Sequence, residues 1–262
     1  MPEFEEGQRG RWAGRNAGKD VVRNRIWAAL EETGVAIGPA WSMIPNFVGA
    51  DVAAWRLART DAWKKARTVK TNPDAPQIPI RLRALYEGKT VYAPVPYLTK
   101  DFPYLRLDPK KLVEKGISFE LAAVAQGFVE HGERIGFEDV EPLDFCVVGS
   151  VAVSRAGGRT GKGAGFADLE TAIFRELGTI NDETPLVTTV HSVQLVDDHE
   201  VVIEPHDSPL DMVATESELI ITGNRQPRPA GVDWDRVRPD QFETIPFLTE
   251  LKTRMLNRRK TG

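Results

Sequence analysis

An apolar run, a cationic glycine loop and a helical pattern follow one another in the middle of the chain, and this order most constrains the fold. The run "LDFCVVGSVAVS" at 143–154 has the length and composition of a buried strand. The loop "GGRTGKGAG" at 157–165 holds five glycines, Arg159 and Lys162. A helical pattern, "FADLETAIFRELG", begins directly after it. A strand that leads through glycines into a helix N-terminus is typical of phosphate-binding sites in α/β proteins.

Short apolar runs alternate with helical patterns along the rest of the chain. Extended segments are predicted at 67–73, 90–96, 185–192, 199–204 and 218–223, and helices at 19–34, 49–66, 78–89, 118–128 and 166–178. Strands separated by helices of this length favour parallel pairing with right-handed crossovers and helices on both faces of the sheet. The expected fold class is therefore α/β, a three-layer α/β/α arrangement with a mainly parallel sheet.

The domain organisation follows from length and composition. The chain has 262 residues, of which 41% are hydrophobic, which suits one large domain with a sizeable core. Residues 1–18 are polar and rich in glycine and arginine, so a flexible arm is expected there. The main domain is predicted at 19–225. A Pro-rich linker and one amphipathic helix at 226–262 are too short for a second domain and are expected to pack on the first.

Charge and cysteine usage exclude several classes of function. The net charge is −4, with 34 basic and 38 acidic residues interspersed, which argues against broad nucleic-acid or membrane binding and predicts that phosphate recognition is local. The single cysteine, Cys146, is predicted to be a buried, inert thiol. No apolar run approaches the ~20 residues of a membrane span, and the first residues lack a signal-peptide core. A cytoplasmic protein is expected; the sequence does not indicate its oligomeric state.

The glycine loop matches neither standard phosphate motif. The segment from Gly157 to Gly161 is one residue short of a Walker loop, and Lys162 is not followed by Ser or Thr. The glycines at 161, 163 and 165 are also spaced differently from a dinucleotide fingerprint. Backbone amides with Arg159 and Lys162 are nevertheless predicted to hold a polyphosphate, with Asp168 approaching a bridging magnesium ion. The alternative is a mobile surface loop in which Asp168 is only a favourable charge at the helix start.

These residues resemble the 5-formyltetrahydrofolate cyclo-ligases, also called methenyltetrahydrofolate synthetases. The family signature is approximately G-x-R-L-G-x-G-x-G-Y-Y-D, and "GGRTGKGAGFAD" shares its glycines, its arginine and its final aspartate. "KDVVR" from Lys19 and "HDSPLD" from His206 resemble two further family motifs, and the order of elements agrees from Lys19 to Thr222. "IPNFVGA", "NPDAPQIPIR" and "GFADLE" look like the divergent branch of methenyltetrahydrofolate synthetase domain-containing proteins.

The resemblance implies a fold, a reaction and a set of roles. The fold is that of ribose-5-phosphate isomerase and the CoA transferases, and the reaction is the ATP- and Mg²⁺-dependent conversion of 5-formyltetrahydrofolate to 5,10-methenyltetrahydrofolate. The formyl oxygen takes the γ-phosphate before the ring closes, so Arg159 and Lys162 are the implied catalytic residues. A small-molecule substrate, most simply a reduced folate, is the implied partner. The implied sites are ATP contacts at Lys19, Arg23, Arg159, Gly161, Lys162, Gly163, Gly165 and Phe166, metal ligands at Asp168 and Asp207, and folate contacts at Asp74, Gln77 and Phe166.

The chain departs from the family pattern on the folate side. The paired tyrosines after the last loop glycine are Phe166 and Ala167, and Thr160 replaces the loop leucine. The family's folate-contacting glutamate has no equivalent, because the corresponding region offers only Asp74 and Gln77. Two alternatives therefore stand beside the cyclo-ligase hypothesis: a nucleotide-binding or regulatory relative without this activity, and phosphoryl chemistry on another formylated or heterocyclic metabolite. Taken singly, Lys19 with Arg23 could also be a solvated helix face, and His206–Asp207 a turn.

Overall fold

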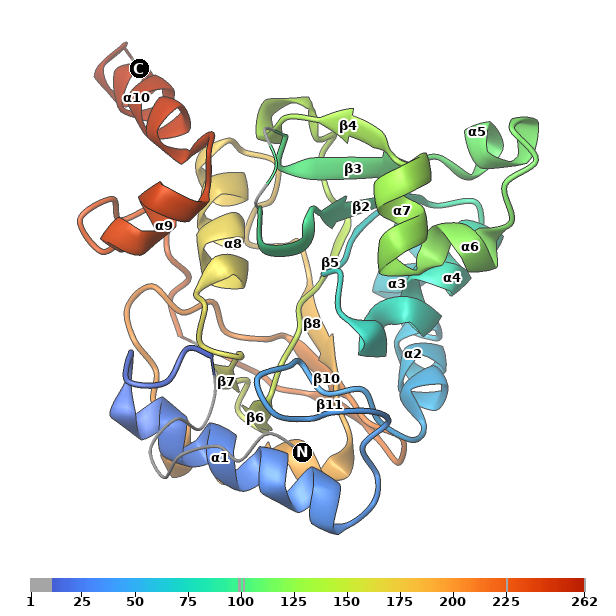
Figure 1. Cartoon of the computed structure of the whole chain (residues 1–262), viewed down its shortest axis with the longest axis vertical. Coiled ribbons are helices and arrows are strands. Elements are labelled where there is room, and N and C mark those ends of the chain that lie inside the picture. Colours follow the sequence, from blue (N-terminus) through green and yellow to red (C-terminus); the bar gives the residue numbers. More distant parts are fainter. Residues whose placement is uncertain (1–10, 99, 101, 225, 262) are drawn as a thin grey trace.

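The computed structural model describes residues 11–98, 100, 102–224 and 226–261. Its centre is an eight-stranded sheet with the order β11-β10-β8-β5-β1-β2-β3-β4 (Figure 1). The strands are β1 Thr68–Lys70, β2 Thr90–Pro94, β3 Tyr104–Leu107, β4 Glu133–Ile135, β5 Phe145–Val147, β8 Leu186–Thr189, β10 Met212–Ala214 and β11 Leu219–Ile221. The five strands from β10 to β2 pair in parallel, whereas β11, β3 and β4 add antiparallel edges.

Helices cover both faces of this sheet, because its central strands are apolar on both sides. The first face carries α2 Ala50–Ala58, α3 Asp61–Lys65, α4 Ile78–Tyr86, α6 Phe119–Ala123 and α7 Ala125–His131, with α5 Pro109–Glu114 at its edge; the second carries α8 Phe166–Glu176, α9 Pro239–Thr244 and α10 Leu248–Thr261 (Figure 1). Alternate residues of β2 serve the two cores: Val91 and Ala93 pack on the α2 and α4 side, and Tyr92 on the α8 side. The predicted three-layer α/β/α class with a mainly parallel sheet is confirmed.

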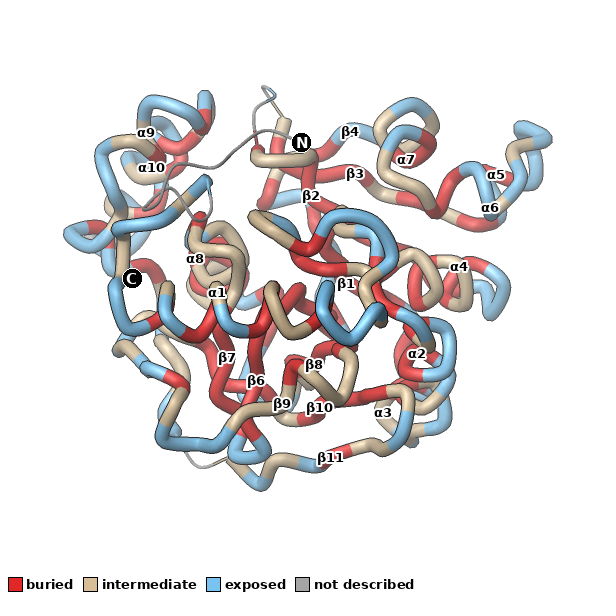
Figure 2. The backbone as a smooth tube through the Cα atoms, turned by 60° about the horizontal axis from the view of Figure 1, so that its bottom comes forward, coloured by how far each residue is buried: buried red, intermediate tan, exposed pale blue. Residues whose placement is uncertain are grey.

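A second, three-stranded sheet packs against the first helix. It consists of β6 Ala152–Ser154, β7 Arg159–Thr160 and β9 Leu195–Val196, and it packs against α1 Ala17–Glu32. Figure 2 shows buried positions recurring along α1, where Val22, Ile26, Trp27 and Leu30 pack against Val151 and Ala152. Lys19 and Arg23 lie on the same buried side of α1, so the alternative of a solvated face for this pair is wrong.

Several predicted elements are divided in the structure. The apolar run at 143–154 contains two strands in different sheets, and the chain turns from one to the other at Gly149, where a Cβ would lie 2.9 Å from Ile44. The helix predicted at 49–66 is interrupted at Thr60, whose hydroxyl caps the start of α3. The helix predicted at 118–128 breaks at Val124, which is extended. Residues 199–204 form no strand, so that prediction is wrong.

The remaining short elements are single 3-10 turns, and the C-terminal region joins the core. The turns are η1 Ala75–Gln77, η2 Pro96–Leu98, η3 Phe137–Asp139, η4 Ser192–Gln194 and η5 Asp198–Glu200. Trp234, Ile245 and Leu251 are buried in the same apolar cluster as Phe174 of α8.

Cys146 is buried as predicted, and burial raises the pKa of its thiol to about 12. Within the described part of the chain, none of the helices has the length and hydropathy needed to cross a membrane.

Candidate functional site

A cavity of about 410 Å³ opens beside the glycine loop, at the carboxyl ends of β1, β2 and β5. Ligands bind at this edge of a parallel sheet in many α/β proteins, because the strand ends and the helix starts meet there. Eleven of the predicted site residues line it: Lys19, Arg23, Asp74, Arg159, Gly161, Lys162, Gly163, Gly165, Phe166, Asp168 and Asp207. Gln77 does not line it; its side chain is 1% exposed and accepts a hydrogen bond from the Asn72 N–H at 2.6 Å.

The glycine loop offers a row of backbone donors. Gly163 and Gly165 have φ values of 106° and 75°, in the left-handed region that favours glycine. Among the residues that the structure describes, the N–H groups of 161–165 donate to no acceptor. The helix that follows, α8, begins after Gly165 without a side-chain cap. Free amides in a left-handed loop at a helix start form an anion-binding concavity.

The loop carbonyls, by contrast, are held from outside. Arg23 Nε donates to the Gly161 carbonyl at 2.7 Å. Arg15 donates to the Ala164 carbonyl at 3.2 Å and forms an ion pair with Asp240 of α9. Two segments far apart in the sequence, before α1 and in α9, therefore fix which way the peptide groups of the loop face.

The resemblance to the cyclo-ligases implies that this loop binds ATP. On that expectation, replacing Arg15 with alanine should weaken ATP binding about tenfold, because the loop amides lose their fixed orientation and preorganised donors bind more tightly than mobile ones. The measurement is calorimetric titration of ATP with Mg²⁺. Arg25→Ala is the matched control, since it removes the ion pair of Arg25 with Glu200, and Arg25 does not line the cavity. Equal ATP affinity in the Arg15 variant and the wild type would contradict the proposed positioning role.

Each cation beside the loop is matched by a carboxylate. Lys19 Nζ lies 2.6 Å from Asp207 Oδ2, and Lys162 Nζ lies 3.0 Å from Asp74 Oδ1. Arg159 Nη2 lies 2.6 Å from both oxygens of Asp168. The positive and negative charges of these three pairs thus balance one another. A phosphate bound together with a divalent cation suits such a site, because the basic groups can bind the phosphate oxygens and the acidic groups can bind the cation.

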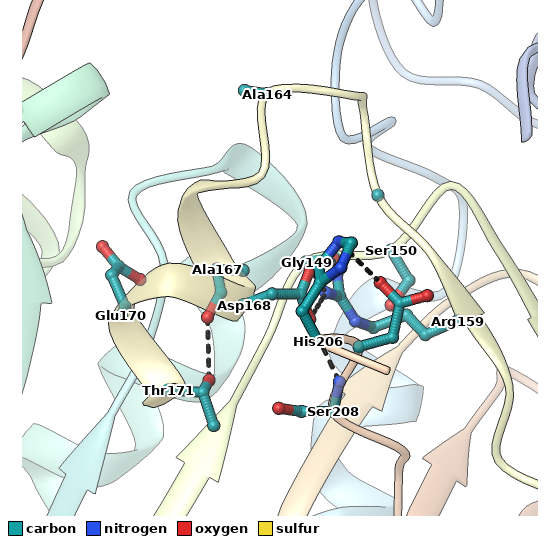
Figure 3. A network of polar contacts seen from close by, with 12 residues as sticks. Gly149, Ser150, Arg159, Ala164, Ala167, Asp168, Glu170, Thr171, His206 and Ser208 are labelled. Carbon is teal, nitrogen blue, oxygen red and sulfur yellow. Dashed lines mark hydrogen bonds and ion pairs between the residues drawn. The ribbon is translucent and has the colours of Figure 1, made fainter. Parts of the chain in front are cut away.

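The Arg159–Asp168 pair joins the glycine loop to α8, and Figure 3 shows it between α8 and the strands. Arg159 also donates to the Gly149 carbonyl at 3.0 Å, and the Ser208 N–H donates to Asp168 at 3.3 Å. Burial acts to raise the pKa of Asp168, but the charge and hydrogen bonds of Arg159, with a smaller contribution from Lys19, outweigh it, so the pKa lies below its ordinary value.

The candidate metal ligands differ in part from the predicted pair. Glu204, His206 and Asp207 each offer a ligand atom, and these atoms lie within 4.8 Å of one another. Asp168 is not in this group, and both of its oxygens accept from Arg159. Magnesium is commonly held by one or two carboxylates together with substrate phosphates, and Asp207 with Glu204 fits that pattern. Glu204 lies two residues before the motif that carried the prediction, which is why the sequence did not single it out.

A second polar cluster at the cavity was not predicted. Lys70 at the end of β1 is 2% exposed, and its Nζ lies 2.9 Å from Glu170 Oε2 on α8. Asn72 lines the cavity beside Glu170 and accepts from the Gly149 N–H at 3.2 Å. One feature of the sequence could have indicated that Glu170 is buried. Glu170 lies three and four residues before the apolar Ile173 and Phe174, and this spacing places it on the buried face of the helix.

Aromatic rings form another wall. Tyr97 and Phe166 meet edge to face with their centroids 6.4 Å apart, and Lys162 Nζ lies 5.2 Å from the Tyr97 ring centroid. Tyr97 and Leu98 have φ values of 59° and 55°, which is unusual for residues with side chains and costs of order 1–3 kcal/mol at each. Such strain gathers at ligand sites, and this wall suits the face of a flat ring.

Arg81 holds the loop that carries Asn72 and Asp74. Its guanidinium is fully buried and donates to the carbonyls of Asn72, Pro73, Asp74 and Ala123. Burial lowers its pKa to about 10, so it remains charged at neutral pH.

Arg81→Met is expected to lower the free energy of unfolding by about 3 kcal/mol or more, because several buried carbonyls lose their donor. Urea unfolding measures it. Arg83→Met is the control on the same helix, since Arg83 is 38% exposed and 3.7 Å from Glu87; a change below about 1 kcal/mol is expected there. Equal effects in the two variants would contradict a structural role for the buried guanidinium.

Comparisons with known proteins agree on one family. The model of the 5-formyltetrahydrofolate cyclo-ligase family matches residues 15–216. The chain is 38% identical over 236 residues to a methenyltetrahydrofolate synthase domain-containing protein of Bos taurus, covering 89% of this chain and 62% of that protein, and 36% identical over 238 residues to the one of Homo sapiens, covering 90% and 62%. It thus spans about three fifths of these relatives' length. The 5,10-methenyltetrahydrofolate synthetase of Aquifex aeolicus, solved by NMR, has a similar fold at 18% identity and a TM-score of 0.51, covering 80% of this chain and 95% of that one.

Proposed function

The chain belongs to the 5-formyltetrahydrofolate cyclo-ligase family, a family of ligases that act on folates, and we propose that it catalyses that family's reaction with ATP and Mg²⁺. The formyl oxygen of 5-formyltetrahydrofolate attacks the γ-phosphorus of ATP and ADP leaves. N10 then attacks the activated formyl carbon and loses its proton, and the oxygen departs with the phosphate, which takes up that proton. The product is 5,10-methenyltetrahydrofolate. Each turnover consumes one ATP and releases one ADP and one phosphate.

The observation that carries the proposal is the row of backbone amides at 161–165, which have no acceptor among the described residues. This row includes the amide of Lys162, lies close to Arg159 and leads into the start of α8. Transfer of a phosphoryl group needs fixed positive charge and donors around the phosphate oxygens more than it needs a nucleophilic side chain. Lys19 and Arg23, on the buried side of α1, reach the same cavity and would bind the remaining phosphates.

Each proposed residue has one task. Lys162 would stabilise the charge of the phosphorylated formyl group, because its side chain extends from the glycine loop into the cavity and ends 3.0 Å from Asp74 Oδ1. Asp207, with Glu204, would hold Mg²⁺, which neutralises phosphate charge when bound. Arg159 would hold the glycine loop in place relative to α8 through its ion pair with Asp168. Phe166 would lie against the substrate ring, as would Tyr97, which contributes an aromatic ring where the loop lacks the family's tyrosines.

The proposal is tested by the stoichiometry of the reaction. Purified protein is mixed with 5-formyltetrahydrofolate, ATP and Mg²⁺, and the ADP released is compared with the folate consumed. One ADP per folate, with none released when either substrate is omitted, is expected. ADP release that does not depend on the folate would point instead to phosphoryl transfer to another acceptor, and a thermal shift by ATP without turnover to a nucleotide-binding role.

A further inference from the structure

Glu170 is the most deeply buried acidic side chain of the cavity. It is 1% exposed, whereas the side chains of Asp74, Asp168 and Asp207 are 10–15% exposed. A buried carboxylate is costly unless partners compensate it, so its place in a cavity wall is informative. In Figure 3 it points away from the Arg159–Asp168 pair, on the other side of the first turn of α8. Glu170 therefore belongs to a different part of the cavity from the phosphate-facing groups.

The partners of Glu170 use only one of its oxygens. Lys70 Nζ donates to Oε2 at 2.9 Å, and Asn72 Nδ2 donates to the same atom at 3.4 Å. Both bonds end on Oε2, so Oε1 accepts from neither Lys70 nor Asn72. The ion pair with Lys70 offsets the cost of burying the charge, and each carboxylate oxygen can accept two bonds. Oε1 is consequently an acceptor with spare capacity.

A second buried group lies beside the same carboxylate. The Tyr104 hydroxyl is fully buried, and Glu170 is its hydrogen-bonding neighbour, although the contact lacks ideal hydrogen-bond geometry. Burial first, and then the negative charge of Glu170, raise its pKa well above the ordinary value, so the phenol stays protonated. The phenol is therefore a neutral neighbour of the Glu170 carboxylate and brings no positive charge to it. The environment of Glu170 is thus arranged around a negative charge that its neighbours do not saturate.

We propose that Glu170 recognises the N–H donor edge of the substrate's heterocycle, an exocyclic amino group beside a ring N–H, as in the 2-amino-4-oxopyrimidine ring of a reduced folate. The inference rests on the proposed function and assigns to α8 the contact for which the sequence suggested Asp74 and Gln77. Asp74 is engaged by Lys162, and Gln77 by the Asn72 N–H. A buried acceptor discriminates strongly, because a ligand without the matching donors leaves it unpaired.

The test compares two ligands on two proteins by calorimetric titration. Glu170→Gln keeps the shape of the side chain but puts a donor where an acceptor is needed. Its affinity for 5-formyltetrahydrofolate is expected to fall at least about tenfold, with ATP affinity changed less than about twofold. The 2-desamino analogue keeps only the ring N–H, so it should bind the wild type at least about tenfold more weakly than the parent ligand and should lose less affinity than the parent ligand in Glu170→Gln. Equal affinity of the two proteins for the parent ligand would overturn the proposal.

Two further arms separate this proposal from folding defects and from failure of the proposed function. Lys70→Met/Glu170→Gln removes both charges together, so no buried ion is left unpaired, and the same loss of folate affinity is expected from a folded protein. Isocytosine carries the same donor edge without the rest of a folate. If the wild type bound no folate, the proposed function would fail. The role of Glu170 would still be supported if NMR showed that isocytosine binds to the wild type and not to Glu170→Gln. Isocytosine bound by neither or by both would overturn the role of Glu170.

Discussion

Asp168→Asn is expected to abolish turnover, with kcat lower by about a thousandfold or more, and to lower the free energy of unfolding by about 3–5 kcal/mol. The asparagine leaves Arg159 as a buried cation without its carboxylate partner, and breaking one side of a buried ion pair has costs of this size. The loop and α8 are joined through this pair, so the loop amides that we propose to bind the phosphates lose their support. Denaturant unfolding and steady-state kinetics measure the two effects.

The pH dependence of stability gives a second signature of the same residue. Because the pKa of Asp168 is lower in the folded protein, its stabilising contribution is present above the ordinary carboxyl pKa of about 4 and is lost as the pH falls through the folded value. The difference in unfolding free energy between wild type and Asp168→Asn should therefore shrink with falling pH below about 4. The control is Asp182→Asn, which breaks an exposed pair with Arg175 and should cost less than about 1 kcal/mol. A pH-independent difference for Asp168 would contradict this account.

Lys162→Ala is expected to lower kcat by about 10²–10³-fold and to weaken ATP binding about tenfold. Fixed positive charge at the point where negative charge develops has effects of this size on the chemical step. Lys162 lies between Asp74 and the Tyr97 ring, so the ammonium is already directed into the cavity before a ligand binds. Single-turnover kinetics, with calorimetric titration of ATP, separates the chemical step from binding.

Two variants serve as comparisons for Lys162. Lys162→Arg keeps the charge and should retain part of the ATP affinity, although its planar group fits the contact with Asp74 differently. Lys111→Ala removes an ion pair with Glu133; Lys111 does not line the cavity, and the variant should leave both measurements unchanged. Unchanged ATP affinity in Lys162→Ala would refute the assignment of the glycine loop to the nucleotide.

The main features of the site could be predicted because they depend on local sequence. The sequence alone indicates three of these features without the tertiary fold: the glycines, the start of α8 at Phe166, and the four-residue spacing of Lys19 and Arg23. Helical spacing alone places Lys19 and Arg23 on one face of α1, and the cavity lies on that face. The parallel sheet likewise follows from the alternation of strands and helices.

What could not be predicted depends on partners distant in the sequence. Glu170 and Lys70 are 100 positions apart, and nothing in either segment names the other. In the sequence, Arg81 resembles any cation on the polar face of an amphipathic helix. Its partners in the structure are backbone carbonyls, which sequence patterns do not reveal. The run at 143–154 was predicted as one strand although it contributes to two sheets, because hydrophobic periodicity cannot distinguish one long buried strand from two short ones.

The most direct test of the central claim is the formation of methenyltetrahydrofolate, followed by its absorbance, when the wild type and Asp168→Asn are each mixed with 5-formyltetrahydrofolate, ATP and Mg²⁺. Absorbance that rises with the wild type, requires ATP and is lost in the variant is the predicted result, and it would show that Phe166 and Ala167 suffice where the family has tyrosines. No rise with a folded wild-type protein that binds both ligands would contradict the cyclo-ligase assignment.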